Sequence, residues 1–249
     1  MAVNSSDLEI LKSFLSFPLN STTEIFAKFK ELPGSIHKKN PEISQEEFVY
    51  IPGKRKDRVL LVAHADTVWH GYSDESSKQT ITVVKSPAGK HLVQRSNHNV
   101  GIGADDRAGC AILWLLKDSG HSLLILDGEE GGRIGSNFLA NDFPELFDEI
   151  NQHQFALQFD RRNAQDYKVY KLPVTEDFHQ FIQDQTGFKD AGKSASTDIC
   201  TLCRDICGAN LSIGYFNEHN PDEDIIINDW QNTLNISRKI LKENCPKFP

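Results

Sequence analysis

The sequence predicts an α/β fold of three layers, in which helices cover both faces of a mixed, mostly parallel central sheet. Short apolar runs rich in β-branched residues alternate with longer runs of helical periodicity, which is typical of successive βαβ units. The run 59–63 is apolar throughout, as expected for a strand that is covered on both faces. Polar residues suited to catalysis follow several of these runs directly, so they should gather at one edge of the sheet.

Composition bounds the class of protein. The 249 residues, 39% of them hydrophobic, suit one large domain with a sizeable core. The net charge of −8, without any block of like charges, argues against nucleic acid or an anionic membrane surface as a partner. No segment is long and apolar enough to span a bilayer, and the first residues lack the features of a secretory signal.

The five cysteines favour a reducing compartment, and we expect a cytoplasmic protein. Their number is odd, and one lies in an expected buried helix, so a disulfide framework is not expected. Cys200, Cys203 and Cys207 have helical spacing, and no fourth ligand follows closely. We therefore interpret these three as packing residues in preference to a zinc knuckle.

The chain begins with two expected helices. Residues 6–17 place leucines at helical spacing, and Ser6 with Glu9 forms a capping box that would satisfy the first free N–H groups. A second box, Ser21 with Glu24, opens the next helix. These helices are interpreted as packing elements without chemistry.

The rest of the chain alternates between the two types of element. A hairpin of 80–84 and 91–95 is expected around the turn 87–89. Strands are expected at 47–51, 58–63, 122–126, 155–159 and 211–216, and helices at 108–117, 134–140, 175–185, 196–206 and 224–241. The walls of a substrate pocket are expected within 70–99 and 161–197.

Histidine and carboxylate residues follow the expected strands. His64 and Asp66 are two residues apart at the end of a strand, so their side chains share a face. Asp105 lies in a glycine-bounded loop ahead of a helix, and three further residues, Glu130, Asp160 and His219, follow later strands. Two imidazoles and several carboxylates at one sheet edge are the ligand set of a two-metal hydrolytic site.

The chemistry of a metal pair suggests a role for each of these residues. One carboxylate must bridge two cations about 3.5–4 Å apart, and Asp105 is suited to this. His64 and His219 would then give one imidazole to each ion, and Glu130 and Asp160 would give the outer carboxylates. Zinc accepts such a mixed N/O set and leaves room for an activated water between the ions; cobalt and manganese are alternatives.

Proton transfer needs a base that is not itself a metal ligand. Adjacent Glu129 and Glu130 point in different directions, so one can bind metal while the other handles the proton. Asp66 would hydrogen-bond the far nitrogen of His64 and fix its tautomer.

In this combination and order the residues resemble the co-catalytic di-zinc exopeptidases, a group that includes tripeptidase-like, aminoacylase-like and compact aminopeptidase families. The resemblance covers roughly 58–240. The matching motifs are His64-Ala65-Asp66-Thr67-Val68, Ile102-Gly103-Ala104-Asp105-Asp106-Arg107-Ala108-Gly109, Gly128-Glu129-Glu130-Gly131, Asp160 and His219. It implies the zinc-exopeptidase fold, the five ligands named above, Glu129 as the base, Asp66 as the orienting residue and a cis peptide bond between Asp105 and Asp106.

Further residues are drawn into the site by the same resemblance. Thr197 and Asp198 look like the Thr-Asp segment that lines the substrate site in compact members, and Glu223 falls where these families often carry an acidic residue. Arg161 and Arg162 are either a surface ion-pair cluster or a clamp for a substrate carboxylate.

One departure from the larger relatives concerns domains. Those relatives insert a lid or dimerisation domain between the fourth ligand and the last histidine, whereas Asp160 and His219 here bracket only about 58 residues. We therefore expect a single catalytic domain over 1–249 without a lid.

The resulting hypothesis is a metal-dependent hydrolase of an amide bond in short peptides, an exopeptidase of the aminopeptidase type. An N-acyl-amino-acid deacylase and a metal-binding, non-catalytic relative are the alternatives. We expect a short peptide or N-acylated amino acid as substrate, no nucleic acid or membrane partner, and a monomer or weak homo-oligomer.

Overall fold

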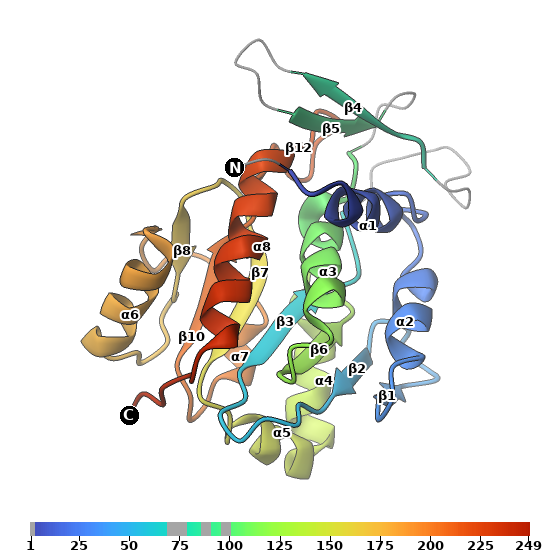
Figure 1. The fold of residues 1–249 in the computed structure, drawn as a ribbon. Helices are drawn as coiled ribbons and strands as arrows, with labels where there is room; N and C mark the ends of the chain where they lie inside the picture. The colour runs from blue at the N-terminus through green and yellow to red at the C-terminus, as the bar shows by residue number, and fades with distance from the viewer. Residues whose placement is uncertain (1–2, 69–78, 86–90, 96–100) are drawn as a thin grey trace.

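An eight-stranded sheet is the centre of the structure, a computed structural model that describes residues 3–68, 79–85, 91–95 and 101–249 (Figure 1). The strands lie in the order β1-β2-β6-β3-β7-β10-β8-β9. Their bounds are β1 (Ile36–Lys39), β2 (Glu47–Ile51), β3 (Leu60–His64), β6 (Ser122–Leu126), β7 (Ala156–Arg161), β8 (Asp166–Lys168), β9 (Lys189–Asp190) and β10 (Gly208–Ser212). The central strands β6, β3, β7 and β10 run parallel, whereas β2 and β8 are antiparallel to their neighbours β6 and β10. The expected mixed, mostly parallel sheet is confirmed.

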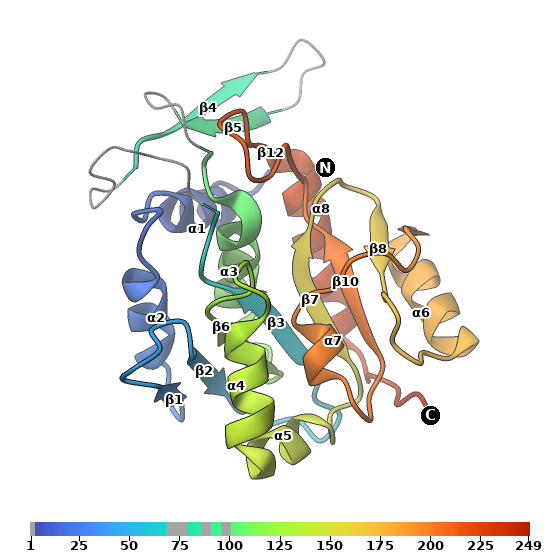
Figure 2. The ribbon, with the colours of Figure 1, turned by 180° about the vertical axis from the view of Figure 1, so that it is seen from behind.

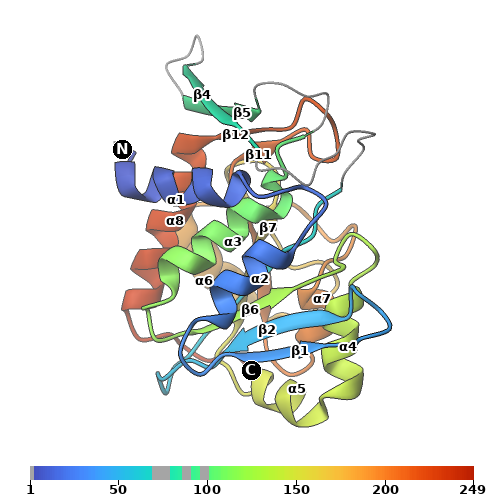
Figure 3. The same ribbon diagram turned by 90° about the vertical axis from the view of Figure 1, so that its right-hand side faces the viewer.

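Helices cover both faces of this sheet, as Figures 2 and 3 show. One layer contains α1 (Ser5–Leu15), α2 (Thr23–Lys30), α3 (Ala104–Leu116), α6 (Glu176–Thr186) and α8 (Ile227–Lys242). The other contains α4 (Ile134–Asp142), α5 (Pro144–Ile150) and α7 (Ile199–Leu202). The helix after β3 therefore lies on one face and the helices after β6 lie on the other, so the crossover direction changes between these neighbouring strands, the place where open α/β sheets usually bind ligands.

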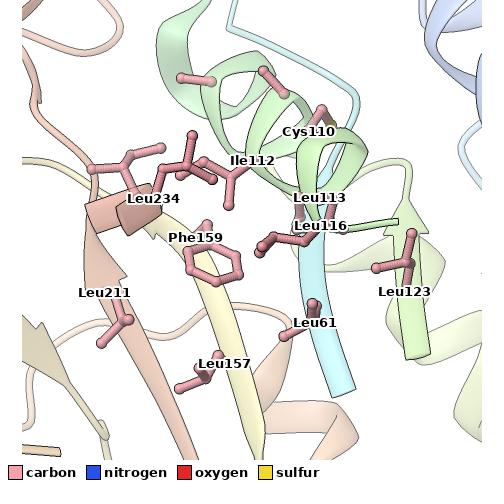
Figure 4. Packing of buried hydrophobic residues seen from close by; sticks show 14 of the residues in the cluster. Leu61, Cys110, Ile112, Leu113, Leu116, Leu123, Leu157, Phe159, Leu211 and Leu234 are labelled. Carbon is pink, nitrogen blue, oxygen red and sulfur yellow. The ribbon is translucent and has the colours of Figure 1, made fainter. Parts of the chain in front are cut away.

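The core consists of two layers because neighbouring strand residues point to opposite faces. Leu61 and Phe159 project toward Leu113 of α3, and all three are fully buried (Figure 4). Leu60 and Val62 belong to the second cluster, beneath α4, α5 and α7. Each such side chain contributes about 1.5–3 kcal/mol through its removal from water, so the central strands are a rigid base for whatever follows their ends.

A second, four-stranded sheet lies beyond the ends of the central strands, near the top of Figure 1. Its order is β11-β12-β5-β4, with β4 (Ile81–Lys85), β5 (His91–Arg95), β11 (Tyr215–Phe216) and β12 (Asp224–Ile226). The expected antiparallel pairing of 80–84 with 91–95 is confirmed, while the turn at 87–89 lies outside the described residues.

The expectation of one last strand over 211–216 is wrong. β10 ends at Ser212 and the chain re-enters sheet structure at Tyr215, now in the second sheet. Between them Gly214 has φ +89°, and a Cβ there would lie 2.9 Å from the backbone N of Trp230. The chain can change sheets here because glycine tolerates this conformation and this close approach.

Several helix boundaries also differ from expectation, and three of them are informative. The first helix is capped by Asn4, whose Oδ1 accepts the N–H of Ser6 at 2.9 Å, so Ser6 is not the cap. The helix expected at 196–206 is reduced to α7. Residues 224–226 pair with β11 and β5 before α8 begins, because these edges offer free backbone partners.

All five cysteines are free, and no group of side chains suited to a metal among the described residues contains a cysteine. In the same part of the chain, no helix combines the length and the apolar character needed to cross a bilayer.

Candidate active site

His64 is the buried end of β3 and the innermost residue of the candidate site. Its side chain is fully buried, and its Nε2 lies 3.2 Å from Asp105 Oδ1 and 3.3 Å from Asp160 Oδ1. Its Nδ1 faces Asp66, 3.0 Å from the backbone oxygen and 3.3 Å from carboxylate Oδ1. The side chain therefore presents Nε2 to two carboxylates and is oriented from behind by Asp66.

Asp105 lies between two groups of potential ligands. Its Oδ2 is 3.3 Å from His219 Nε2, on the side opposite His64. Its Oδ1 is buried and has no hydrogen-bond partner. The expected cis peptide bond between Asp105 and Asp106 is present, and both residues have non-helical dihedral angles at the start of α3.

Asp106 supports this turn through its carboxylate, a role that was not predicted from the sequence. Its carboxylate accepts the backbone N–H groups of His64 (3.2 Å) and Gly109 (3.0 Å). A Cβ on Gly109 would lie 2.2 Å from the carbonyl oxygen of Phe159, so only glycine lets α3 approach β7 this closely. In the sequence, the only signal for this role of Asp106 was its position next to Asp105.

Glu130 and His219 form the outer part of the site. Glu130 Oε1 lies 2.7 Å from His219 Nε2. Both residues lie in loops, Glu130 after β6 and His219 between β11 and β12, and His219 has φ +60°. The five expected ligands thus converge, and among the described residues the groups with metal-binding spacing are His64 with Asp105 and Glu130, and His64 with Asp106 and Asp160.

Asp66 supports two other site residues besides His64. Its carboxylate oxygens accept the backbone N–H of Glu129 (3.2 Å) and of Glu130 (3.1 Å). One carboxylate therefore orients the buried histidine and fixes the loop that carries the expected base and an expected ligand.

Asp160 is held by three polar residues around the end of β7. Its Oδ2 accepts hydrogen bonds from the Thr197 hydroxyl (2.8 Å) and Gln158 Nε2 (3.0 Å), and Asn210 Oδ1 accepts its backbone N–H (2.9 Å). Thr197, expected to line the substrate site, thus supports Asp160 directly. Gln158 lies inside an expected strand and Asn210 directly before one, so neither was predicted to belong to the site.

The carboxylates of the site titrate in an unusual environment. Burial, reinforced by the charge of Asp160, raises the pKa of Glu129 to about 8. Burial and the charge of Asp105 raise the pKa of Asp160 to about 7 in spite of His64. Burial disfavours the charged form of Asp105 too, but the adjacent imidazoles of His219 and His64 outweigh it and hold the pKa of Asp105 below its usual range. Protons and cations would compete for these atoms.

The four residues expected to bind substrate occupy different environments. Arg161 forms two hydrogen bonds with Asp166, at 2.7 and 3.1 Å. Arg162, whose side chain is 59% exposed, pairs with Glu218 at 2.7 Å. Both guanidinium groups therefore already have a carboxylate partner.

Asp198 is fully buried next to Thr197, and neither of its carboxylate oxygens has a hydrogen-bond partner. The nearby Ser136 hydroxyl donates to the carbonyl oxygen of Arg133 at 3.2 Å. Burial and the charge of Glu129 raise the pKa of Asp198 to about 7.

Glu223 connects the loop of the outer histidine to the loop of the central aspartate. Its buried carboxylate accepts the backbone N–H groups of Gly103 (2.7 Å) and Asp105 (3.0 Å). The resemblance suggested an acidic residue here, and the structure shows which atoms it holds.

The comparisons find proteins similar to this chain in structure and none similar in sequence. No protein-family model matches the sequence, and no curated protein matches it. The fold is similar to that of the aminopeptidase PepT from Bacillus cereus ATCC 10987, with 12% identity over 96% of this chain and 98% of that chain and a TM-score of 0.65. A tripeptidase from Staphylococcus aureus subsp. aureus Mu50 (12% identity, 97% and 100% coverage, TM-score 0.63) and an aminopeptidase from the archaeon Desulfurococcus kamchatkensis (13%, 97% and 96%, 0.59) are also similar. The TM-scores and coverages show a shared α/β fold, and at these low identities they show the fold alone.

Proposed function

We propose that this chain is a metal-dependent exopeptidase of the aminopeptidase type, which hydrolyses an amide bond in short peptides. The observation that carries the proposal is the position of Asp105, with Oδ1 3.2 Å from His64 Nε2 and Oδ2 3.3 Å from His219 Nε2. A carboxylate placed between two imidazoles has the geometry needed to serve two cations at once.

The residues present fit two divalent cations. The buried Oδ1 of Asp105 has no hydrogen-bond partner, and a cation would satisfy it. His64 and Asp160 would hold the inner ion and Glu130 and His219 the outer ion, with Asp105 shared. The donor set suits zinc, with cobalt or manganese as alternatives. When bound, the cations would lower the pKa of a water molecule and polarise the scissile carbonyl.

The side chains around this centre would handle the substrate and its proton. Glu129, held through its backbone N–H by Asp66, would accept a proton from the attacking water at its carboxylate and deliver it to the leaving nitrogen. Thr197 would keep Asp160 oriented through its hydroxyl.

A substitution of the base tests this function. In Glu129→Gln we expect metal content close to that of the wild type and a fall in turnover of about 10²–10⁴-fold, the usual value of a general base. The measurements are metal analysis and hydrolysis of dipeptides, tripeptides and N-acetyl-amino acids in the presence of zinc, cobalt or manganese. Retained turnover would refute the assigned base.

The same substrate panel separates the alternatives. Hydrolysis of N-acyl amino acids in preference to peptides would identify a deacylase. Metal binding without hydrolysis of any member would identify a non-catalytic relative. A single catalytic domain without a lid, a monomeric or weakly oligomeric state and a cytoplasmic location belong to the same proposal. The single domain is supported by the large sheet, because the segment between Asp160 and His219 contributes β8, β9 and β10 to it.

A further inference from the structure

Lys168 is a nearly buried lysine beside the candidate site, and most of its hydrogen-bonding capacity is unused. The residue is only 6% exposed. Its Nζ donates to the hydroxyl of Ser194 at 3.0 Å and lies 5.5 Å from the centre of the Tyr170 ring. An ammonium group carries three N–H donors, and this hydroxyl is their one hydrogen-bond acceptor within the described residues.

The register of the large sheet places Lys168 in line with the site. Asn210 of β10 is paired with Gln158 of β7 on one side and with Lys168 of β8 on the other. The three residues therefore form a row across the strands. Neighbouring strands are about 4.8 Å apart, so the α-carbons at the ends of this row are about 10 Å apart.

The row lies on the face of the sheet that carries the site. Tyr167 packs in the cluster under α6, so the next side chain, that of Lys168, points to the opposite face. The same alternation places His64 and Asp160 on that face, because Val62 and Ala156 pack there. Asn210, in the middle of the row, contacts residues next to both of its ends, since its Nδ2 donates to the Asp160 carbonyl oxygen and to the Tyr170 hydroxyl, each at 2.9 Å.

The charges around Lys168 leave room for an anion. Arg161 and Arg162 have carboxylate partners, whereas no ion pair joins Lys168 to another described residue. Burial lowers the pKa of Lys168, and the positive charges of Arg161 and Arg162 lower it further, outweighing the smaller opposite effects of Asp166 and Asp190. A carboxylate bound here would relieve that repulsion and fill the free donors.

We propose that Lys168 and Ser194 form a subsite for the carboxylate of the substrate's leaving group, the C-terminal carboxylate of a dipeptide or tripeptide. The inference rests on the proposed exopeptidase function. A carboxylate one or two residues beyond the scissile bond lies about 3.5–7 Å from it, a distance that the lysine side chain can bridge from the end of the row. The subsite therefore selects short peptides with a free C-terminus.

The experiment compares a peptide with its own C-terminal carboxamide. On metal-loaded wild type, we expect kcat/KM to be about 10- to 100-fold higher for the free acid, as a charge-assisted hydrogen bond would give. In Lys168→Met that preference should disappear, with the carboxamide hydrolysed as by the wild type. Lys168→Arg should restore part of the preference because it keeps the charge.

Two controls separate charge recognition from a structural effect. Lys171→Met removes the same charge from an exposed position three residues away and should leave the ratio unchanged. Binding of a non-hydrolysed D-peptide acid and its carboxamide to the wild type, measured by calorimetry, reports the same preference without turnover, so the question is answered even if Lys168→Met does not fold.

The possible outcomes distinguish the carboxylate subsite from the proposed exopeptidase function. Equal hydrolysis and equal binding of acid and carboxamide by the wild type would overturn the subsite and leave the exopeptidase function standing. An equal loss on both substrates in Lys168→Met would show that the lysine is structural and would also overturn the subsite. Hydrolysis of neither substrate by the wild type would overturn the proposed function and the subsite with it.

Discussion

The inner and outer halves of the candidate metal site are built in different ways. The inner side chains, His64 and Asp160, are 0% and 7% exposed and come from adjacent parallel strands. The outer side chains, Glu130 and His219, are 16% and 41% exposed and come from loops. Strands packed on both faces have few alternative positions, whereas loops are held only by the contacts that their residues make.

The supporting contacts follow the same division. The inner half has Asp66 behind His64, and Thr197, Gln158 and Asn210 around Asp160. In the outer half the supporting hydrogen bonds go to the loop backbone and not to the side chains, such as those from the N–H groups of Glu129 and Glu130 to Asp66. We therefore expect the inner half to bind a cation more tightly than the outer half, because its ligands are already in place.

The largest expected effect comes from removing the carboxylate that the two halves share. In Asp105→Ala we expect both cations to be lost and turnover to fall by more than about 10³-fold, since even one electrostatic contact in an active site is worth about 10²–10³-fold. Metal analysis after gel filtration and a hydrolysis assay measure the two effects. Asp118→Ala, at a side chain that is 88% exposed, is the control. Full occupancy of both ions in Asp105→Ala would contradict the bridging role.

The difference in cation affinity between the inner and outer halves is tested by replacing one histidine at a time. We expect His219→Ala to keep one tightly bound cation, and His64→Ala to lose tight binding altogether. The lost step should weaken by at least about 100-fold, because changes behind the ligands already cost about 10–100-fold. Calorimetric titration with zinc, and the absorption spectrum of bound cobalt, count the remaining steps. Identical titrations for the two variants would show that the halves are equivalent.

The smallest expected effect comes from Glu223, which connects the outer loop to the central aspartate. In Glu223→Gln one backbone N–H, that of Gly103 or Asp105, would face an amide donor in place of a carboxylate oxygen. We expect outer-cation affinity to fall about 10–100-fold and the free energy of unfolding to fall by about 1–3 kcal/mol.

Calorimetry and thermal unfolding measure these two changes, with Asp222→Asn as the matched control. Asp222 is the exposed neighbour of Glu223, and its amide variant removes the same charge. Unchanged cation affinity in Glu223→Gln, with lower stability, would reduce Glu223 to a structural residue.

The sequence was most informative where burial and side-chain chemistry change abruptly. The apolar run before His64 predicted a buried strand, and a polar residue at its end was recognisable for that reason. It was least informative where the outcome depends on distant partners. The 211–216 run was predicted to be one strand, but Tyr215 pairs in the second sheet. Arg161 was a candidate for binding a substrate carboxylate, but in the fold it forms an ion pair with Asp166.

The order of the central strands, of the longer helices and of the candidate site residues along this chain follows from local pattern, because periodicity and strand ends are properties of neighbouring residues. The tertiary structure decided which of those residues meet. Gln158 and Asn210 support Asp160, Glu223 holds the Asp105 loop 118 residues away, and Lys168 falls in line with the site. Such contacts depend on strand order and register, which are fixed only when the whole sheet assembles.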